Sequence, residues 1–480
     1  MARIQVEDLP RGFAVDETLR LKPRIREVVE DGVTVLVDPV GGGWLGLAGA
    51  AAGILESLRN GTQAWWLVRQ HGSFVAPALE NLASQGLLEG RELPQAVHAA
   101  KGACAGIRFS VTLTTRCNLA CIYCAQAAGV SGTTMSRRVL YRVMDTIFSV
   151  PKADGYDIHF GGGETLLEFE LLKSGVRYAR RHAPSEVRFS IQTNGTTIDQ
   201  TRARWLAEER FHVGVSLDGM DVVQNRHRPF SDGSPSYAQT MAGIARLHGA
   251  GVRIYPLATL MEPDEFDALF DFMISHELHA FLVRAASFGG RNRTPLTANQ
   301  QEQIAKAHLG LFDRILDHLE ATGERLHEER SACVLKALLA PPGSAVCIEP
   351  CVAGRGIIAF TPDGSFYPCD RFVDSIEMRV GHVSERQPLL AAVERSPVVA
   401  RLAQRNYQVV ARCRACTFRL YCQGSCSAAS YYRFGDLRRE SDQCVHDRTF
   451  LLGMMARASK RPELVSRYYR AVQAGPHPGT

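Results

Sequence analysis

The stretch TTRCNLACIYCAQ, residues 114–126, places three cysteines within eight positions. Cys117, Cys121 and Cys124 have the spacing C-x3-C-x2-C, which lets thiolates from one loop converge on one inorganic core. A structural zinc site needs four protein ligands, and the nearest downstream histidine, His159, belongs to a separate apolar stretch. A cubane iron–sulfur cluster held by three thiolates keeps one iron without a protein ligand. The spacing therefore predicts such a cluster, with an open iron that binds a small molecule.

Length and composition limit the class of protein. The chain has 480 residues, which is enough for two to four domains. No run approaches the roughly 18 apolar residues of a membrane helix, and residues 1–10 show no secretory signal. The net charge of +5 is spread along the chain and predicts no nucleic-acid partner. We therefore expect a cytoplasmic protein without a membrane partner.

Residues 1–95 read as a small α+β domain. The segment IREVVEDGVTVLVDP alternates apolar residues around Asp31-Gly32, which predicts a β-hairpin, and WLGL can add a third strand. Helical patterns follow over residues 50–58, 64–71 and 73–88, the last of them ending before Gly90. Three strands with three helices predict a winged-helix-like domain, with Trp65 and Trp66 in its core and a linker over residues 96–106.

Residues 107–330 alternate between strand-like and helix-like segments. Six apolar stretches are separated by helical patterns: IRFSVTL, YDIHF, VRFSIQT, HVGVSL, RIYPLAT and AFLVRAA. Such βα repeats imply a parallel sheet, because each crossover between parallel strands needs a helix. The fold class is therefore α/β, with a partial (β/α)6 barrel. Ligands should gather at the C-terminal ends of the strands, where the three cysteines also lie.

The cysteine loop resembles the signature of the radical S-adenosylmethionine (SAM) superfamily. The resemblance implies that the open iron chelates the methionine part of SAM. It further implies that the reduced cluster cleaves SAM to a 5′-deoxyadenosyl radical, which abstracts a substrate hydrogen. Cubane clusters can reach the low potentials that this requires. Tyr123 matches the aromatic position that borders the adenine in this family.

Further segments resemble strand-end motifs of the same family. The GGE motif implies a backbone and a carboxylate that receive the methionine ammonium group, although Thr165 stands where proline is commoner. The other motifs, IQTNG, VSLDG and NRHRP, imply polar contacts with SAM or substrate. The matching residues are Gly162, Gly163, Glu164, Gln192, Thr193, Asn194, Ser216, Asp218, Asn225 and Arg228.

A second set of cysteines runs from Cys347 to Cys444 and resembles the SPASM domain of peptide-modifying radical SAM enzymes. The resemblance implies two auxiliary [4Fe-4S] clusters, three clusters in all, and a domain over residues 331–447 before a C-terminal helix and tail over 448–480. The inner cluster would use Cys347, Cys351, Cys369 and Cys426, and the outer one Cys413, Cys416, Cys422 and Cys444. A zinc ribbon is the alternative, because C-x2-C knuckles are common zinc ligands. Without Cys347 the inner cluster would have an open iron.

One further residue, Asp370, completes the candidate sites, and two cysteines remain outside them. Asp370 directly follows Cys369 and matches an aspartate that acts as a base in anaerobic sulfatase-maturating enzymes. The alternative is an aspartate that only supports the cluster or lies at the surface. Cys104 and Cys333 stand apart from both sets and are expected to be inert thiols.

Residues 21–95 resemble the PqqD-like RiPP recognition element, which binds leader peptides by adding a strand to a sheet edge. A DNA-binding wing is the alternative for this domain. Together the resemblances imply a maturase that installs a thioether or carbon–carbon cross-link in a precursor peptide or small protein. A formylglycine-forming sulfatase maturase is the enzymatic alternative, and a non-catalytic iron–sulfur electron carrier or peptide-binding scaffold is the alternative from another class. A low-potential donor of the flavodoxin or ferredoxin type is the expected electron source.

Overall fold

The computed structural model describes residues 11–474, except residues 15, 73–74, 94–105, 153, 341–350 and 386. Its centre is a sheet of ten strands in the order β12-β11-β10-β9-β8-β7-β6-β13-β14-β15. The six expected barrel strands are neighbours in this sheet and run parallel. They are β6 (Arg108–Thr112), β7 (Tyr156–Gly161), β8 (Val187–Thr193), β9 (His212–Ser216), β10 (Ile254–Leu260) and β11 (Ala280–Ala285). The prediction of a partial α/β barrel is therefore confirmed.

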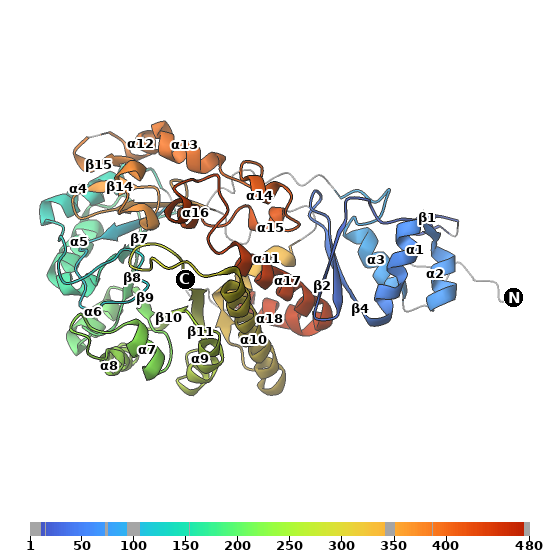
Figure 1. Cartoon of the computed structure of the whole chain (residues 1–480). Helices are drawn as coiled ribbons and strands as arrows, with labels where there is room; N and C mark the ends of the chain where they lie inside the picture. The colour runs from blue at the N-terminus through green and yellow to red at the C-terminus, as the bar shows by residue number, and fades with distance from the viewer. Residues whose placement is uncertain are drawn as a thin grey trace.

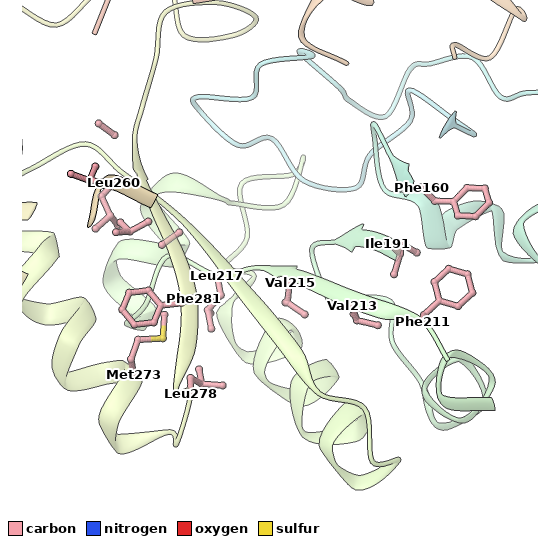
Figure 2. Close-up of a cluster of buried hydrophobic side chains, with 14 of the residues drawn as sticks. Phe160, Ile191, Phe211, Val213, Val215, Leu217, Leu260, Met273, Leu278 and Phe281 are labelled. Carbon is pink, nitrogen blue, oxygen red and sulfur yellow. The ribbon is translucent and has the colours of Figure 1, made fainter. Parts of the chain in front are cut away.

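Helices cover the outer face of the barrel strands (Figure 1). They are α4 (Arg137–Phe148), α5 (Phe169–His182), α6 (Gln200–Glu208), α7 (Asp221–His227), α8 (Tyr237–Gly249) and α9 (Asp264–Ser275). Alternate strand residues such as Phe160, Ile191 and Val213 are buried in one large core (Figure 2). This alternation leaves the other set of strand residues, which is largely polar, on the inner face of the barrel.

The cysteine-rich region continues the barrel sheet, an arrangement that the sequence did not suggest. β13 (Ile357–Phe360) pairs parallel with β6, and β14 (Ser365–Tyr367) and β15 (Gly381–His382) follow antiparallel. At the opposite edge β12 (His327–Glu328) pairs with β11. The remaining helices are α10 (Ala298–Thr322), α11 (Glu329–Leu338), α12 (Leu389–Arg395), α13 (Pro397–Gln404), α14 (Ala411–Arg414), α15 (Arg419–Cys422) and α16 (Ser427–Phe434).

The N-terminal module contains the predicted hairpin and third strand: β2 (Arg26–Glu30), β3 (Val33–Val37) and β4 (Trp44–Ala48). Asp31 and Gly32 both have positive φ angles, 49° and 74°, as a tight two-residue hairpin turn requires. The other elements are β1 (Thr18–Leu19), η2 (Gly49–Ile54), α1 (Leu55–Asn60), β5 (Thr62–Gln63), α2 (Ala64–His71) and α3 (Ala76–Ser84).

Two expectations for this module need correction. The last helix ends at Ser84 and not near Leu88, because Leu88 instead bridges to Leu21 at the other end of the module. Trp66 was expected in the core but is 38% exposed, whereas Trp65 packs against the core of the module.

Strand β3 joins the module to the rest of the molecule. One face of β3 packs inside the module, and the other face packs against the large core. Leu36 belongs to the module's own core, whereas Val33, Val35 and Val37 are buried in the large core that includes α17 (Cys444–Lys460). Figure 1 shows the sheet of the blue module beside the red helix α17. Because its central strand β3 is buried on both faces, the module is an integral part of the molecule.

The C-terminal region differs from the one helix and tail that were expected over residues 448–480. α17 begins earlier, at Cys444, and a second helix, α18 (Pro462–Ala474), follows a break at Arg461. Proline disfavours helical backbone in the residue before it, which explains the break. Among the described residues, no helix has the length and apolar character needed to span a membrane.

Candidate active site

The loop with Cys117, Cys121 and Cys124 follows β6 and is held from outside by one arginine. Arg291 donates from its backbone N–H to the Cys124 carbonyl at 2.8 Å, and from its guanidinium to the Cys121 carbonyl at 2.5 Å. A side chain at Gly290 would place its Cβ 2.2 Å from the same Cys124 carbonyl oxygen. The sequence analysis missed this support, and the Gly289-Gly290 pair was the only local signal for a close approach.

The three thiols lie close enough to act on one another electrostatically, and all are at least partly buried. Burial is the main cause that raises the pKa of Cys117, to about 12, and burial also raises the pKa of Cys121. A thiolate in such a place needs a positive partner, and a metal centre provides one. The loop therefore fits an iron–sulfur cluster.

The GGE segment lies against this cysteine loop. The Gly163 and Glu164 N–H groups donate to the carbonyls of Thr114 and Arg116 at 3.0 and 2.8 Å. A Cβ at Gly163 would lie 2.1 Å from the Arg116 oxygen, and Gly162 has a φ of 109°. Only glycine allows this approach and this conformation.

The Glu164 carboxylate joins the strand ends to each other. It is buried and accepts hydrogen bonds from the Thr193 hydroxyl and from the Asn194 N–H, both at 2.8 Å. Burial raises its pKa, while these hydrogen bonds and that of Leu166 N–H oppose the rise. Among the described residues, Glu164 Oε2 accepts one hydrogen bond, from the Asn194 N–H. The ammonium group of a ligand bound here would share Oε2 with that N–H.

Asn194 connects the end of β8 to the loop that carries Cys117, Cys121 and Cys124, here called the cluster loop. Its side-chain amide lies 2.9 Å from Asn118 Oδ1 and 3.9 Å from Cys117 Sγ. Thr193 and Asn194 therefore lie next to the first cysteine, although the sequence separates them from it by more than 70 positions.

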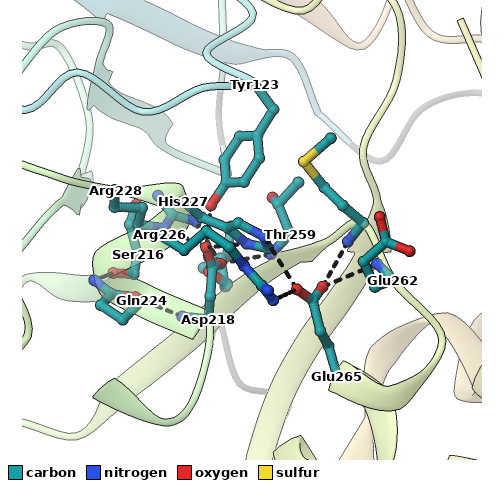
Figure 3. A network of polar contacts seen from close by, with 12 residues as sticks. Tyr123, Ser216, Asp218, Gln224, Arg226, His227, Arg228, Thr259, Glu262 and Glu265 are labelled. Atoms are coloured by element: carbon teal, nitrogen blue, oxygen red, sulfur yellow. Dashed lines mark hydrogen bonds and ion pairs between the residues drawn. The ribbon is translucent and has the colours of Figure 1, made fainter. Parts of the chain in front are cut away.

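A buried carboxylate, Asp218, is the centre of a second network (Figure 3). Arg228 donates two hydrogen bonds to it, at 2.9 and 3.0 Å, and the Tyr123 hydroxyl and Thr259 N–H donate to it as well. Burial opposes ionisation of Asp218, but the Arg228 charge and hydrogen bonds lower its pKa below the usual value. The Arg228 guanidinium also lies over the Tyr123 ring, 5.2 Å from its centroid.

His227 and Glu265 extend this network, and the sequence analysis missed both. His227 Nε2 lies 3.1 Å from Glu265 Oε1, and its Nδ1 lies 3.5 Å from Asp218 Oδ2. Burial opposes protonation of His227, but the two carboxylates raise its pKa to about 9. No local sequence motif identifies a histidine that bridges two carboxylates from separate segments.

Two expected polar residues contact protein groups. Gln192 Nε2 donates to Ser216 Oγ at 2.9 Å, which joins β8 to β9 on the inner face of the barrel. Asn225 Oδ1 accepts from Tyr237 N–H at 2.9 Å and so holds the start of α8. Ser216 remains at the strand end where ligands of such barrels gather.

The second set of cysteines is brought into two groups. Cys351, Cys369 and Cys426 lie on one small core cluster, and the Cys369 and Cys426 thiols act on each other electrostatically. The Cys413, Cys416 and Cys444 thiols interact in the same way. Cys422 lies between Cys416 and Cys426 in the chain, and Cys347, like Cys104, lies outside the described residues. The contacts of the described thiols therefore join three cysteines of each expected set.

Among the described residues, no three His, Cys, Asp or Glu side chains are placed to hold a single metal ion.

Asp370 lies between the inner cysteine group and the barrel. Its Oδ1 is 3.0 Å from Cys369 Sγ, and its carbonyl accepts from Gln126, two residues after Cys124, at 3.5 Å. Its charge also acts on His159, on the inner face of β7, whose pKa is lowered to about 4, chiefly by burial. The structure therefore brings together the cluster loop, the barrel interior and the inner group around this carboxylate.

Comparison with protein families identifies two domains. The model of the radical SAM superfamily matches residues 111–273, and the model of the SPASM iron–sulfur cluster-binding domain matches residues 351–417. The serine-type anaerobic sulfatase-maturating enzyme of Klebsiella aerogenes is 27% identical over 348 residues, which is 66% of this chain and 81% of that protein. The mycofactocin maturase MftC of Mycobacterium ulcerans is 26% identical over 341 residues, 69% of this chain and 86% of that protein.

Solved structures share the fold. Native anSMEcpe with bound AdoMet superimposes with a TM-score of 0.64 at 19% identity, covering 76% of this chain and 100% of that one. SuiB of Streptococcus suis bound to precursor peptide SuiA gives a TM-score of 0.52 at 12% identity, covering 88% of this chain and 98% of that one. The fold is therefore that of radical SAM and SPASM domains, and the chain is an enzyme with an iron–sulfur cluster-binding domain.

Proposed function

We propose that this enzyme is a radical SAM maturase that installs a thioether or carbon–carbon cross-link in a ribosomally made precursor peptide or small protein. The proposal rests on three segments that lie together: the cysteine loop, the end of β7 and the end of β8. Asn194, after β8, contacts Cys117, and Glu164, after β7, accepts a hydrogen bond from the Asn194 N–H. A non-catalytic electron carrier has no need of such an arrangement around an open iron.

The cofactors follow from the residues that fit them. Cys117, Cys121 and Cys124 would hold the SAM-binding cluster, and the inner and outer groups would hold two auxiliary clusters, three in all. The GGE backbone, Tyr123, Ser216 and the Asp218–Arg228 pair would border SAM. When bound, SAM and the reduced cluster supply a 5′-deoxyadenosyl radical.

A flavodoxin- or ferredoxin-type protein would reduce the clusters. A cytoplasmic location accords with an iron–sulfur enzyme whose other cysteines stay reduced.

Asp370 is the proposed base toward the substrate. Its place between Gln126, Cys369 and His159 puts a carboxylate where the barrel interior meets the inner group. A carboxylate there can accept the proton that a substrate side chain loses during oxidation.

The N-terminal module is the proposed site of leader recognition. β2 is an edge strand of the β2-β3-β4 sheet, and its Val29 side chain is 68% exposed. An edge strand with free backbone groups can pair with an extended peptide. Two similar proteins support a peptide substrate: one is named mycofactocin maturase, and the other, SuiB, was solved bound to precursor peptide SuiA.

A formylglycine-forming activity is the second candidate. The sulfatase-maturating relatives and the position of Asp370 beside Cys369 favour it. The two functions differ in their product: a cross-link joins two residues, whereas formylglycine is an aldehyde at one residue.

The test is a reaction of the anaerobically reconstituted full-length enzyme with SAM, dithionite and the protein encoded by a neighbouring gene. Deoxyadenosine and the mass of the protein are measured together. We expect deoxyadenosine to form, and the mass of the substrate protein to decrease by two hydrogen atoms for each cross-link. A new aldehyde at one Cys or Ser would support the second candidate instead.

A further inference from the structure

Arg405 is a buried arginine between the two auxiliary groups and is 8% exposed. Its guanidinium donates five hydrogen bonds, to the carbonyls of Gly424, Ser425, Leu437 and Arg439 and to the Ser430 hydroxyl, at 2.7–3.1 Å. Each of the three guanidinium nitrogens thus donates to at least one fixed acceptor within the cysteine-rich domain.

Two of these acceptors, the carbonyls of Gly424 and Ser425, belong to the loop between Cys422 and Cys426. Cys422 and Cys426 are four positions apart, yet they belong to different expected clusters. The three residues between them all have positive φ angles: Gln423 54°, Gly424 93° and Ser425 55°. Such backbone is rare for Gln and Ser and persists only where the surroundings hold it. Arg405 Nη2 and Nη1 hold this loop by its carbonyls, at 2.8 and 3.0 Å.

The charge of Arg405 is not paired with a carboxylate in the part of the chain that the structure describes. All five acceptors are neutral, and no carboxylate among the described residues forms an ion pair with this guanidinium. Arg412, by contrast, pairs with Glu440 at 3.1 Å. A buried charge without a counter-charge is costly, and arginine cannot avoid the cost by losing its proton.

The groups that do act on this charge are cysteines from both sets. They are Cys351 and Cys426 of the inner group and Cys413 and Cys422 of the outer group. Ligated four-iron clusters carry net negative charge in their thiolate shells, so both clusters would offset the guanidinium.

We propose that Arg405 is the shared counter-cation of the two auxiliary clusters and a positioning residue for the loop that divides their ligands. The inference rests on the proposed ligand sets. A positive charge beside a cluster favours its reduced, more negative state. Because Arg405 interacts with both sets, its charge should raise both reduction potentials together.

The test uses Arg405→Gln and Arg405→Lys in a background where Cys117, Cys121 and Cys124 are alanine, so that only auxiliary clusters titrate. Iron per chain is measured, and both potentials are measured by dithionite titration with mediator dyes and EPR detection. In R405Q we expect both potentials to fall, with at least a tenfold lower ratio of reduced to oxidised cluster at a fixed potential, which is about 59 mV for a one-electron couple. R405K keeps the charge and should stay near the parent.

Arg401→Gln is the matched control, because Arg401 is an exposed arginine on the neighbouring helix α13. Its potentials should equal those of the parent. Unchanged potentials in R405Q, or a change at one cluster only, would overturn the proposal.

The iron content of the two Arg405 variants also tests the proposal. If R405Q loses auxiliary iron while R405K retains it, the requirement for charge is supported. Equal loss in both variants would show that Arg405 only holds the loop, and would overturn the counter-cation role. A parent protein that binds no auxiliary iron would instead refute the ligand sets of the proposed function.

Discussion

Arg228 holds Asp218 with two parallel hydrogen bonds: Nε lies 3.0 Å from Oδ2, and Nη2 lies 2.9 Å from Oδ1. Both side chains are buried. The Tyr123 hydroxyl donates to the same carboxylate, and Tyr123 directly precedes Cys124. This pair therefore ties the cluster loop to the C-terminal end of β9.

Replacing Asp218 with asparagine should destabilise the protein, because Arg228 would keep a buried charge without a partner. Removal of one member of a buried ion pair typically costs about 3–5 kcal/mol. Denaturant titration of the free energy of unfolding measures this. Glu302→Gln is the control: it breaks the exposed pair with Lys306 and should cost at most about 1 kcal/mol. Equal costs would contradict the role assigned to Asp218.

Stability should fall as the pH rises through the range in which His227 loses its proton. Asp218 and Glu265 raise the pKa of His227 from 6.5 to about 9 against the opposing effect of burial. The protonated form therefore contributes fully below about pH 6.5, and this contribution, about 3 kcal/mol, is lost as the pH rises through 9. His227→Gln should flatten the stability profile between these pH values. The exposed His248→Gln should leave the profile unchanged, and an unaltered slope in H227Q would refute the assignment.

The triple variant Cys117→Ala, Cys121→Ala, Cys124→Ala should lose about four of about twelve iron atoms per chain, because only the SAM-binding cluster is removed. Deoxyadenosine formation should disappear. Iron analysis and chromatography check both results. If deoxyadenosine still forms in this variant, the assignment of these cysteines to SAM cleavage is wrong.

Asp370→Asn should separate SAM cleavage from product formation. The variant keeps the shape of the side chain but cannot accept a proton as a carboxylate does. We expect deoxyadenosine to form at a rate near that of the parent, while product falls by about 10²-fold or more, the usual contribution of a general base. Equal losses of deoxyadenosine and product would indicate a structural role beside Cys369.

Val29→Asp should weaken binding of the precursor if the leader pairs with β2. A charge at this exposed edge position opposes docking of an extended peptide. Deleting the module is a poor test, because Val33, Val35 and Val37 belong to the large core. Val222→Asp, at a valine that is 66% exposed on α7, is the matched control. Equal precursor affinities, measured by fluorescence anisotropy, would argue against recognition by β2.

The sequence predicted the barrel and the cysteine groups because each carries a local signal. Strands such as VRFSIQT alternate apolar and polar residues, and the spacing of Cys117, Cys121 and Cys124 requires only one loop. The GGE segment is recognisable as a short motif, but the contact that requires Gly163, with the Arg116 carbonyl, comes from a distant segment.

The parts that the sequence did not predict depend on contacts between distant segments. Arg291 and Arg405 stand in no recognisable motif. His227 lies within NRHRP, but no role was predicted for it. The partners of all three come from other segments. The attachment of the module had a weak signal in VTVLV, where Val35 and Leu36 point to opposite faces and both are apolar. Such a strand must be buried on both sides, but the pattern does not identify α17 as the covering element.

Formation of a cross-link is decided by the fragment mass spectrum of the precursor after co-expression with this enzyme under anaerobic conditions. We expect a loss of two hydrogen atoms per cross-link and no backbone fragments between the two joined residues. The same precursor expressed with the triple cysteine variant should be unmodified. A precursor of unchanged mass and complete fragmentation, from an enzyme that binds it and cleaves SAM, would contradict the claim.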